Sequence, residues 1–355
     1  MLFKSDVVLA PRTITVRVVV DPARTLINSL GLLGMTESRS GLGDWIVQTA
    51  AAMSPELRRD NEIAGQLFDL IDLGDDPMEF PALIKRIEQQ DMTVAIRKLV
   101  RHIAEKENID PDQILNLKEG YVELINSFFI NKGEDCNKEL IAAAYDYMVE
   151  PEAARSFLIQ HLKTMWSQYL EAEWNRVRPV LYETAAVFDQ LDLSDLTPLE
   201  AIQAVTGRDM TAFWKDDETE ELIFVPSTHT GPYMSQWGMD EKRRTFMIYG
   251  ARVPEGVQTT STELSLRDLL VQFTALADDS RLRILSLLTH NRELSSQDFQ
   301  QMLDLSQSAA SRHLRQLVAT GYLNERRRDL NKVFSLNPQR VQETAAAMRI
   351  HLSRK

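Results

Sequence analysis

The sequence has a single cysteine, no long apolar run and few glycines. Because Cys136 has no second cysteine in the chain, it can form neither an intramolecular disulfide nor a thiolate metal cage. No stretch of about 18 apolar residues predicts a membrane-spanning helix, and the opening MLFKSDVVLAPR lacks the apolar core of a secretory signal. We therefore expect a cytoplasmic protein that does not associate with membranes.

The common motifs of nucleophilic, nucleotide-binding and metallohydrolase chemistry are also missing. The sequence contains no G-x-S-x-G, no Walker A loop, no G-x-G-x-x-G after a predicted strand and no H-E-x-x-H. We therefore expect no enzyme activity, no catalytic residues, no cofactor and no metal site.

Charge is divided unevenly along the chain. The net charge of −12 at pH 7 argues against a nucleic-acid-binding protein, because phosphate contacts need clustered Lys and Arg. Residues 264–355, however, carry a net charge of +5, whereas residues 1–263 carry −17. The stretch VPEGVQTTST has no apolar periodicity and predicts a linker. We therefore expect an acidic domain over residues 1–262 and a second domain over residues 263–355, with separate roles.

The first domain has the pattern of a mainly α (α+β) fold. Apolar residues recur every three or four positions, which predicts helices over residues 22–33, 43–53, 55–73, 80–90, 93–107, 138–149, 151–191 with a break, and 198–205. Runs of β-branched and aromatic residues predict strands at 13–20, 221–225 and 245–249. We expect these strands to form a small antiparallel sheet.

A loop rich in glycine, proline and aromatics separates the last two predicted strands. In this aromatic loop, Pro226–Trp237, the side chains of His229, Tyr233 and Trp237 combine polar tips with apolar bodies. They are the candidate residues for a small-molecule effector. A packed connecting loop, with its Gly-Pro pair fixing a turn, is the alternative and the interpretation that we favour.

The second domain shows helix signals followed by a basic hairpin. Helices are predicted at 264–277, after Asp279-Ser280, at 296–303 and at 306–320. The second of these carries Leu282, Leu285 and Leu288 as its expected packing stripe. On the last, at 100° per residue, an apolar stripe faces one side and polar and cationic side chains face the other. The apolar stripe consists of Ala310, Leu314 and Leu317.

The polar face of helix 306–320 and the hairpin 322–336 are suited to DNA. Small polar side chains permit close approach to the major groove, arginine can bind guanine edges or phosphates, and a cationic wing suits phosphates. The candidate DNA-binding residues are Ser306, Gln307, Ser308, Ser311, Arg312, Arg315, Arg326, Arg327, Arg328 and Lys332.

The segments LVQFTALADDSRLRILSLL and LSQSAASRHLRQLVATGYL, followed by the basic hairpin, resemble the ArsR/SmtB family of winged-helix regulators over Leu269–Asn337. FVPSTHTGPY and MIYGARVPEG resemble an uncharacterised N-terminal extension that some ArsR-like proteins carry. The resemblance implies a transcriptional repressor that binds double-stranded DNA as a homodimer, with recognition helices in successive major grooves. It also implies that the first helix of the domain and the last, Pro338–Leu352, build the dimer contact. Docking of the first helix onto the other domain of the same subunit is the alternative.

The chain departs from the metal-sensing members of that family. Ser295 and Gln297 stand where those members place a pair of cysteines, and neither is a ligand for soft metals. The last helix offers Glu343 and His351 but no second imidazole at helical spacing. We therefore expect a regulator whose effector is of another kind. An enzyme, or a protein-interaction domain, fused to a DNA-binding module remains the alternative.

Overall fold

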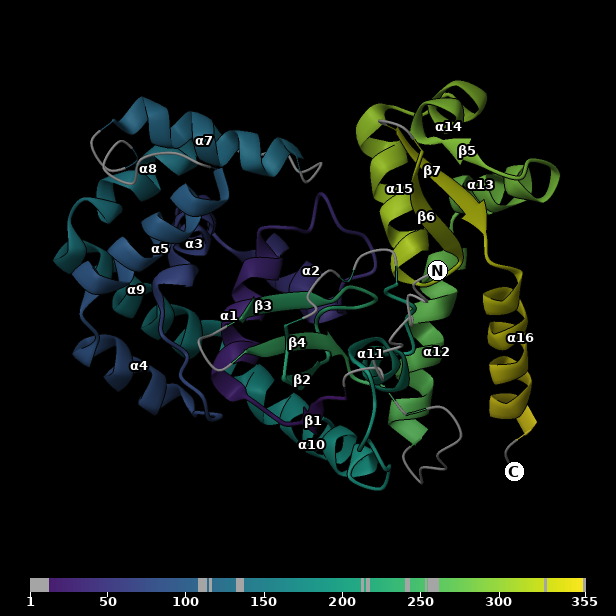
Figure 1. Ribbon diagram of the computed structural model, residues 1–355, viewed down its shortest axis with the longest axis horizontal. Coiled ribbons are helices and arrows are strands. Elements are labelled where there is room, and N and C mark those ends of the chain that lie inside the picture. The colour runs from purple at the N-terminus through teal and green to yellow at the C-terminus, as the bar shows by residue number, and fades with distance from the viewer. Residues whose placement is uncertain are drawn as a thin grey trace, which may run out of the picture. The chain divides into compact units, whose positions relative to one another are not determined.

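The computed structural model describes residues 13–107, 114, 117–131, 137–211, 214, 218–239, 243–252, 254, 262–328 and 331–353. It forms two compact units (Figure 1). The helical unit comprises Val20–Pro179 and Thr228–Gly231, and the sheet-containing unit comprises the rest of the chain. The domain boundary at residue 262 stays a prediction. Among the described residues, no helix is long and apolar enough to cross a membrane.

The helical unit contains the helices that the apolar periodicity predicts. Prolines at the first helical position open three of them, where the missing N–H is not needed. The elements are α1 (Pro22–Leu33), α2 (Asp44–Ala52), α3 (Pro55–Leu67), η1 (Phe68–Leu70), α4 (Phe80–Gln89), α5 (Met92–Glu107), α7 (Lys118–Asn131), α8 (Lys138–Met148), α9 (Pro151–Met165), η2 (Trp166–Leu170) and α10 (Glu171–Phe188), which continues into the other unit.

Two features of these helices add to the prediction. The π-helical turn η2 lies between α9 and α10, and it is the break that was expected within residues 151–191. Helix α7 was not predicted, because its apolar residues do not form a single stripe. The mainly α fold class is confirmed.

The sheet is mixed, so the prediction of an antiparallel sheet is wrong. Its order is β1-β2-β4-β3, with β1 (Thr15–Val18) parallel to β2 (Glu221–Ser227) and β2 parallel to β4 (Arg244–Gly250). The reason is a strand within the expected loop, β3 (Ser235–Met239), which pairs antiparallel with β4. Because β3 reverses the chain once more, β4 runs in the direction of β2 (Figure 1).

Helix α11 (Pro198–Thr206) and the end of α10 contribute to the core that the sheet builds. A capping box between Thr197 and Glu200 starts α11, and Gly207, with φ 68°, ends it in the left-handed region that glycine tolerates. The shared core contains Ile14, Phe188, Ala201, Ile202, Val205, Leu222, Phe224, Met247 and Tyr249. The chain that leaves this core at Gly207 places Arg208.

The C-terminal elements form a helical domain with a three-stranded sheet of order β5-β7-β6. They are α12 (Thr262–Leu276), α13 (Asp279–His290), β5 (Leu294–Ser295), α14 (Ser296–Leu303), α15 (Gln307–Ala319), β6 (Leu323–Arg328), β7 (Asn331–Leu336) and α16 (Pro338–Ser353). Their buried core includes Phe299, Leu314, Leu317, Tyr322 and Phe334. Helices α13 to α15 with the β6–β7 hairpin have the order expected from the sequence.

Candidate nucleic-acid interface

The turn between α14 and α15 is fixed by short local contacts. Ser295 caps α14 and forms a capping box with Asp298, whose carboxylate accepts from the Ser295 N–H at 2.7 Å. Asp304, with φ 53°, ends α14 in the left-handed region. Ser306 then caps α15 by accepting from the N–H of Ala309 at 3.2 Å. These caps set where α15 begins and hence which of its side chains face outward.

Helix α15 has one buried face and one accessible face. The predicted packing residues Ala310, Leu314 and Leu317 are buried. The accessible face carries the candidate residues, of which Ser306, Gln307, Ser308 and Arg312 are exposed and Ser311 and Arg315 are half-buried. The geometry therefore leaves a polar, cationic helix surface of the type that enters a major groove.

The antiparallel hairpin β6–β7 lies where the sequence predicts a wing, and whether it acts as one stays a prediction. Arg326 makes a bidentate ion pair with Glu293, with Nε–Oε1 and Nη2–Oε2 distances of 2.5 Å, and Lys332 lies 2.9 Å from Glu325. The hydrogen bonds between Arg326 and Glu293 raise the pKa of the arginine and lower that of the carboxyl. Sequence reasoning missed both carboxylates. A phosphate group would have to compete with Glu293 for the Arg326 side chain. Arg327 and Arg328 are also exposed and lie farther along the hairpin.

A buried arginine holds α13 against the neighbouring helices. The guanidinium of Arg281 donates to the carbonyl oxygens of Ala275 and Thr274 and to Gln316 Oε1, at 2.7, 2.8 and 2.7 Å. Burial is the largest influence on Arg281 and lowers its pKa. These bonds join the end of α12 to the buried side of α15. This role could not be predicted from the sequence, because Arg281 stands in a segment with three other charged residues.

Ser295 and Gln297, at which the family resemblance would imply metal-binding cysteines, have other roles here. The hydroxyl of Ser295 is used in the capping box, and Gln297 is an exposed residue of α14. Among the residues that the structure describes, no cluster of three or more His, Cys, Asp or Glu side chains is placed to hold a metal ion.

The aromatic loop is divided between the two units. His229 belongs to the helical unit, where it is buried, stacks on Trp45 and lies 2.7 Å from both Glu173 and Ser29. Burial raises the pKa of the Glu173 carboxyl, but hydrogen bonds from His229 and Arg176 outweigh it and the net shift is downward.

The other two aromatic-loop candidates belong to the sheet-containing unit. Tyr233 is buried, and Trp237 is half-buried on β3 opposite Phe246. The three candidates therefore do not lie together within either unit, and their role in ligand binding stays a prediction.

The C-terminal elements contain a helix-turn-helix, a fold used for binding DNA, followed by the β6–β7 hairpin. Residues 278–325 match the model of the bacterial regulatory protein, arsR family. The C-terminal region is also 36% identical, over 77 residues, to the arsenic resistance transcriptional regulator ArsR1 of Pseudomonas putida. That match covers 21% of this chain and 60% of the relative. Residues 278–325 are thus an ArsR-family helix-turn-helix domain, and the large N-terminal part lies outside both matches.

Proposed function

We propose that this protein is a cytoplasmic, sequence-specific transcriptional repressor that binds double-stranded DNA as a homodimer. The observation that carries the proposal is the accessible face of α15, which presents small polar residues and two arginines directly after a capped turn. The similarity to an arsR-family model and to a named transcriptional regulator supports the same role. In this proposal α15 reads base edges and the wing contacts phosphates.

The test is fluorescence-anisotropy binding of the full chain to a duplex from upstream of its own gene, titrated with salt. A scrambled duplex of equal length and composition is the control. We expect tighter binding to the upstream duplex and an affinity that falls steeply with salt, because phosphate contacts release counterions. Equal affinity for both duplexes would contradict sequence-specific recognition.

The wing makes a separate prediction. Replacing Arg327 and Arg328 by alanine should weaken binding to both duplexes alike and reduce the salt slope by about 2, since each phosphate contact contributes about one counterion. Arg326→Ala should have a smaller effect, because Glu293 already pairs with that guanidinium. Anisotropy titrations from low to moderate salt measure both quantities. A loss restricted to the specific duplex would contradict the phosphate-binding role.

Apolar side chains exposed on α12 and α16 support the dimer. The two helices pack against each other within the subunit. Even so, Leu266, Leu270, Val341, Met348 and Leu352 remain 39–71% exposed. Apolar surface left on two adjacent helices is suited to a second copy of the chain. This favours dimerisation through α12 and α16, as the family resemblance implies.

Placing a carboxylate on this surface should separate the subunits. We expect Leu270→Asp to convert the dimer to a monomer in sedimentation velocity, because a buried unpaired charge is strongly unfavourable. Leu282→Asp on α13 is the matched control, since Leu270 and Leu282 are equally exposed at 51%. An unchanged dimer in Leu270→Asp would place the contact elsewhere.

The proposal includes no enzyme activity. Ser29, His229 and Glu173 form a hydrogen-bonded chain, but all three are at most 4% exposed. The Ser29 hydroxyl also lies 2.7 Å from the carbonyl oxygen of Thr25, to which it can only donate. This arrangement suits a structural anchor for the aromatic loop better than an accessible nucleophile. An effector would then act by favouring one dimer geometry over another.

A further inference from the structure

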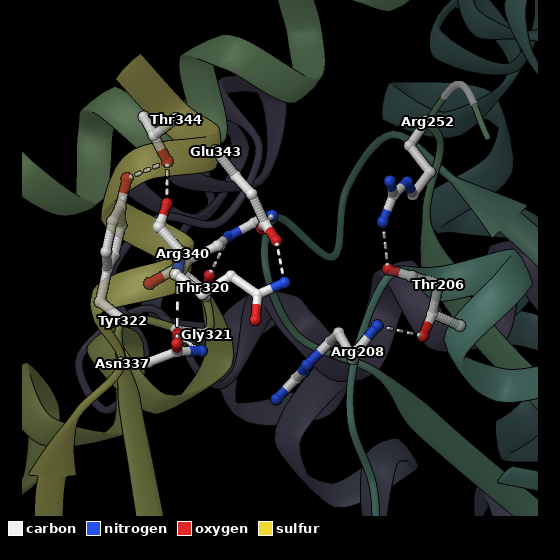
Figure 2. A network of polar contacts seen from close by, with 11 residues as sticks. Thr206, Arg208, Arg252, Thr320, Gly321, Tyr322, Asn337, Arg340, Glu343 and Thr344 are labelled. Carbon is white, nitrogen blue, oxygen red and sulfur yellow. Dashed lines mark hydrogen bonds and ion pairs between the residues drawn. The ribbon is translucent and has the colours of Figure 1, made fainter. Parts of the chain in front are cut away.

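The side chain of Arg208 joins the aromatic loop to helix α15. Gly207 turns the chain after α11, and the N–H of Arg208 donates to Thr206 Oγ1 at 3.3 Å. The guanidinium then donates through Nη1 to the carbonyl oxygen of Pro232 at 3.1 Å and through Nη2 to that of Val318 at 3.4 Å. In Figure 2 this side chain extends toward the segment of Thr320 and Gly321. One planar group therefore bridges the loop and the last turn of α15.

The C-terminal end of α15 already has a cation and further contacts from its own domain. Three hydrogen bonds tie it to the start of α16: Arg340 Nε to the carbonyl oxygen of Thr320 at 2.9 Å, Asn337 Nδ2 to that of Gly321 at 3.0 Å, and Tyr322 Oη with Thr344 Oγ1 at 2.9 Å (Figure 2). A cation at this end also complements the helix dipole. Capping of α15 thus does not by itself require Arg208.

Adding Arg208 to this end has an electrostatic cost. Burial, followed by the nearby charge of Arg340, lowers the pKa of Arg208 to about 10, so its charged form is less favourable there than in water. A second guanidinium beside Arg340 is therefore not explained by the stability of the helix end. Arg208 differs from Arg340 because it precedes the C-terminal domain in the sequence. Its guanidinium donates hydrogen bonds to Pro232 as well as to Val318.

The aromatic loop, to which Arg208 donates a hydrogen bond, also lies near Arg281, a second arginine that contacts α15. Tyr233 acts on the pKa of both Arg208 and Arg281, opposing the larger downward effect of burial on each. Arg281 in turn donates to Gln316 on the buried side of α15. At its other end, within the helical unit, the loop is anchored by His229, which lies three residues before Pro232 in the sequence.

We propose that Arg208 is a positioning residue for DNA recognition, which holds the C-terminal end of α15 in register with the aromatic loop. The inference rests on the proposed function and extends it, because it gives the N-terminal part of the chain a direct connection to the recognition helix. A change in the position of the loop would alter the orientation of α15 and hence the selectivity for DNA.

The test compares full-length Arg208→Ala and Arg208→Lys with the wild type on the upstream and scrambled duplexes. Arg17→Ala is the matched control, since it removes an arginine from β1 that is exposed and paired with Glu221. We expect both Arg208 variants to lose about tenfold in affinity for the upstream duplex, the scale of one lost hydrogen bond to a charged group, with the scrambled duplex and the salt slope unchanged. Arg208→Lys should not restore the affinity for the upstream duplex, because lysine lacks the planar guanidinium group that can donate to two carbonyl oxygens at once.

Three results would overturn the inference in distinguishable ways. A wild type that binds both duplexes equally removes the proposed function and the inference together. A selective wild type with equally selective Arg208→Ala leaves the function and removes the role of Arg208. Rescue by Arg208→Lys would show that charge alone matters and that no bridge is needed.

A second measurement tests the contact between Arg208 and α15 in the absence of DNA. Amide hydrogen exchange over residues 313–322 should be faster in Arg208→Ala than in the wild type, because the last turn of α15 loses one of its external contacts. Exchange over α13 and the wing should stay the same, which distinguishes a local release from a failure to fold. Unchanged exchange over 313–322 would contradict a positioning role.

Discussion

Arg312→Ala/Arg315→Ala is expected to abolish selective binding while leaving a weak, salt-dependent affinity for any duplex. Both arginines lie on the accessible side of α15, opposite the buried stripe. A base contact by arginine contributes about 1–3 kcal/mol of discrimination, so the double variant should lose at least about thirtyfold for the upstream duplex. Anisotropy titrations of the upstream and scrambled duplexes measure this loss.

The matched control is Arg283→Ala/Arg349→Ala, which removes two exposed arginines from α13 and α16 and so changes the net charge equally. It should retain the selectivity of the wild type. If the two double variants weaken binding to the same extent, the loss reflects total charge, and α15 is not the element that reads the sequence.

The free energy of unfolding should fall by about 2 kcal/mol between pH 7 and pH 5 through one buried histidine. His161 on α9 is 4% exposed, and burial lowers its pKa to about 4 from an ordinary value of 6.5. The unfolded chain therefore takes up this proton first as the pH falls below 6.5. The stability due to neutral His161 is complete above pH 6.5 and is lost progressively toward pH 4.

The hydrogen bonding of His161 defines the variant that tests this. Asn61 donates through Nδ2 to the carbonyl oxygen of Leu30, so its Oδ1 must accept from His161 Nε2, at 3.1 Å. His161→Gln can keep a donor there without titrating, and it should flatten the decrease measured by urea unfolding at pH 7 and pH 5. His102→Gln, at an exposed position on α5, should leave the decrease unchanged. If the free energy of unfolding of His161→Gln falls between pH 7 and pH 5 as much as that of the wild type, other groups cause the decrease.

Local signals in the sequence were sufficient for most helices. Prolines at Pro22, Pro55 and Pro151 open helices because they fit the first turn, and the Ser306 cap fixes the start of α15. The family resemblance in residues 269–337 added the order of α13, α14, α15 and the wing, which the structure reproduces.

Strand directions and contacts between residues far apart in the sequence could not be predicted from these local signals. The direction of β4 depends on β3, whose residues SQWGM have little strand character. His229 meets Ser29, which is 200 positions away, and Arg326 meets Glu293 across the wing. Leu282 was expected to be buried with Leu285, yet it is 51% exposed, because the neighbouring elements cover only part of the apolar surface of α13.

The most direct test of the central claim is protection of guanine N7 from methylation on the upstream duplex. N7 lies in the major groove, where α15 is proposed to bind. The account predicts protected guanines in two major grooves about one helical turn apart for the wild type, and their loss in Arg312→Ala/Arg315→Ala. Bound protein that leaves every guanine N7 reactive, or protection that the double variant retains, would contradict recognition through α15.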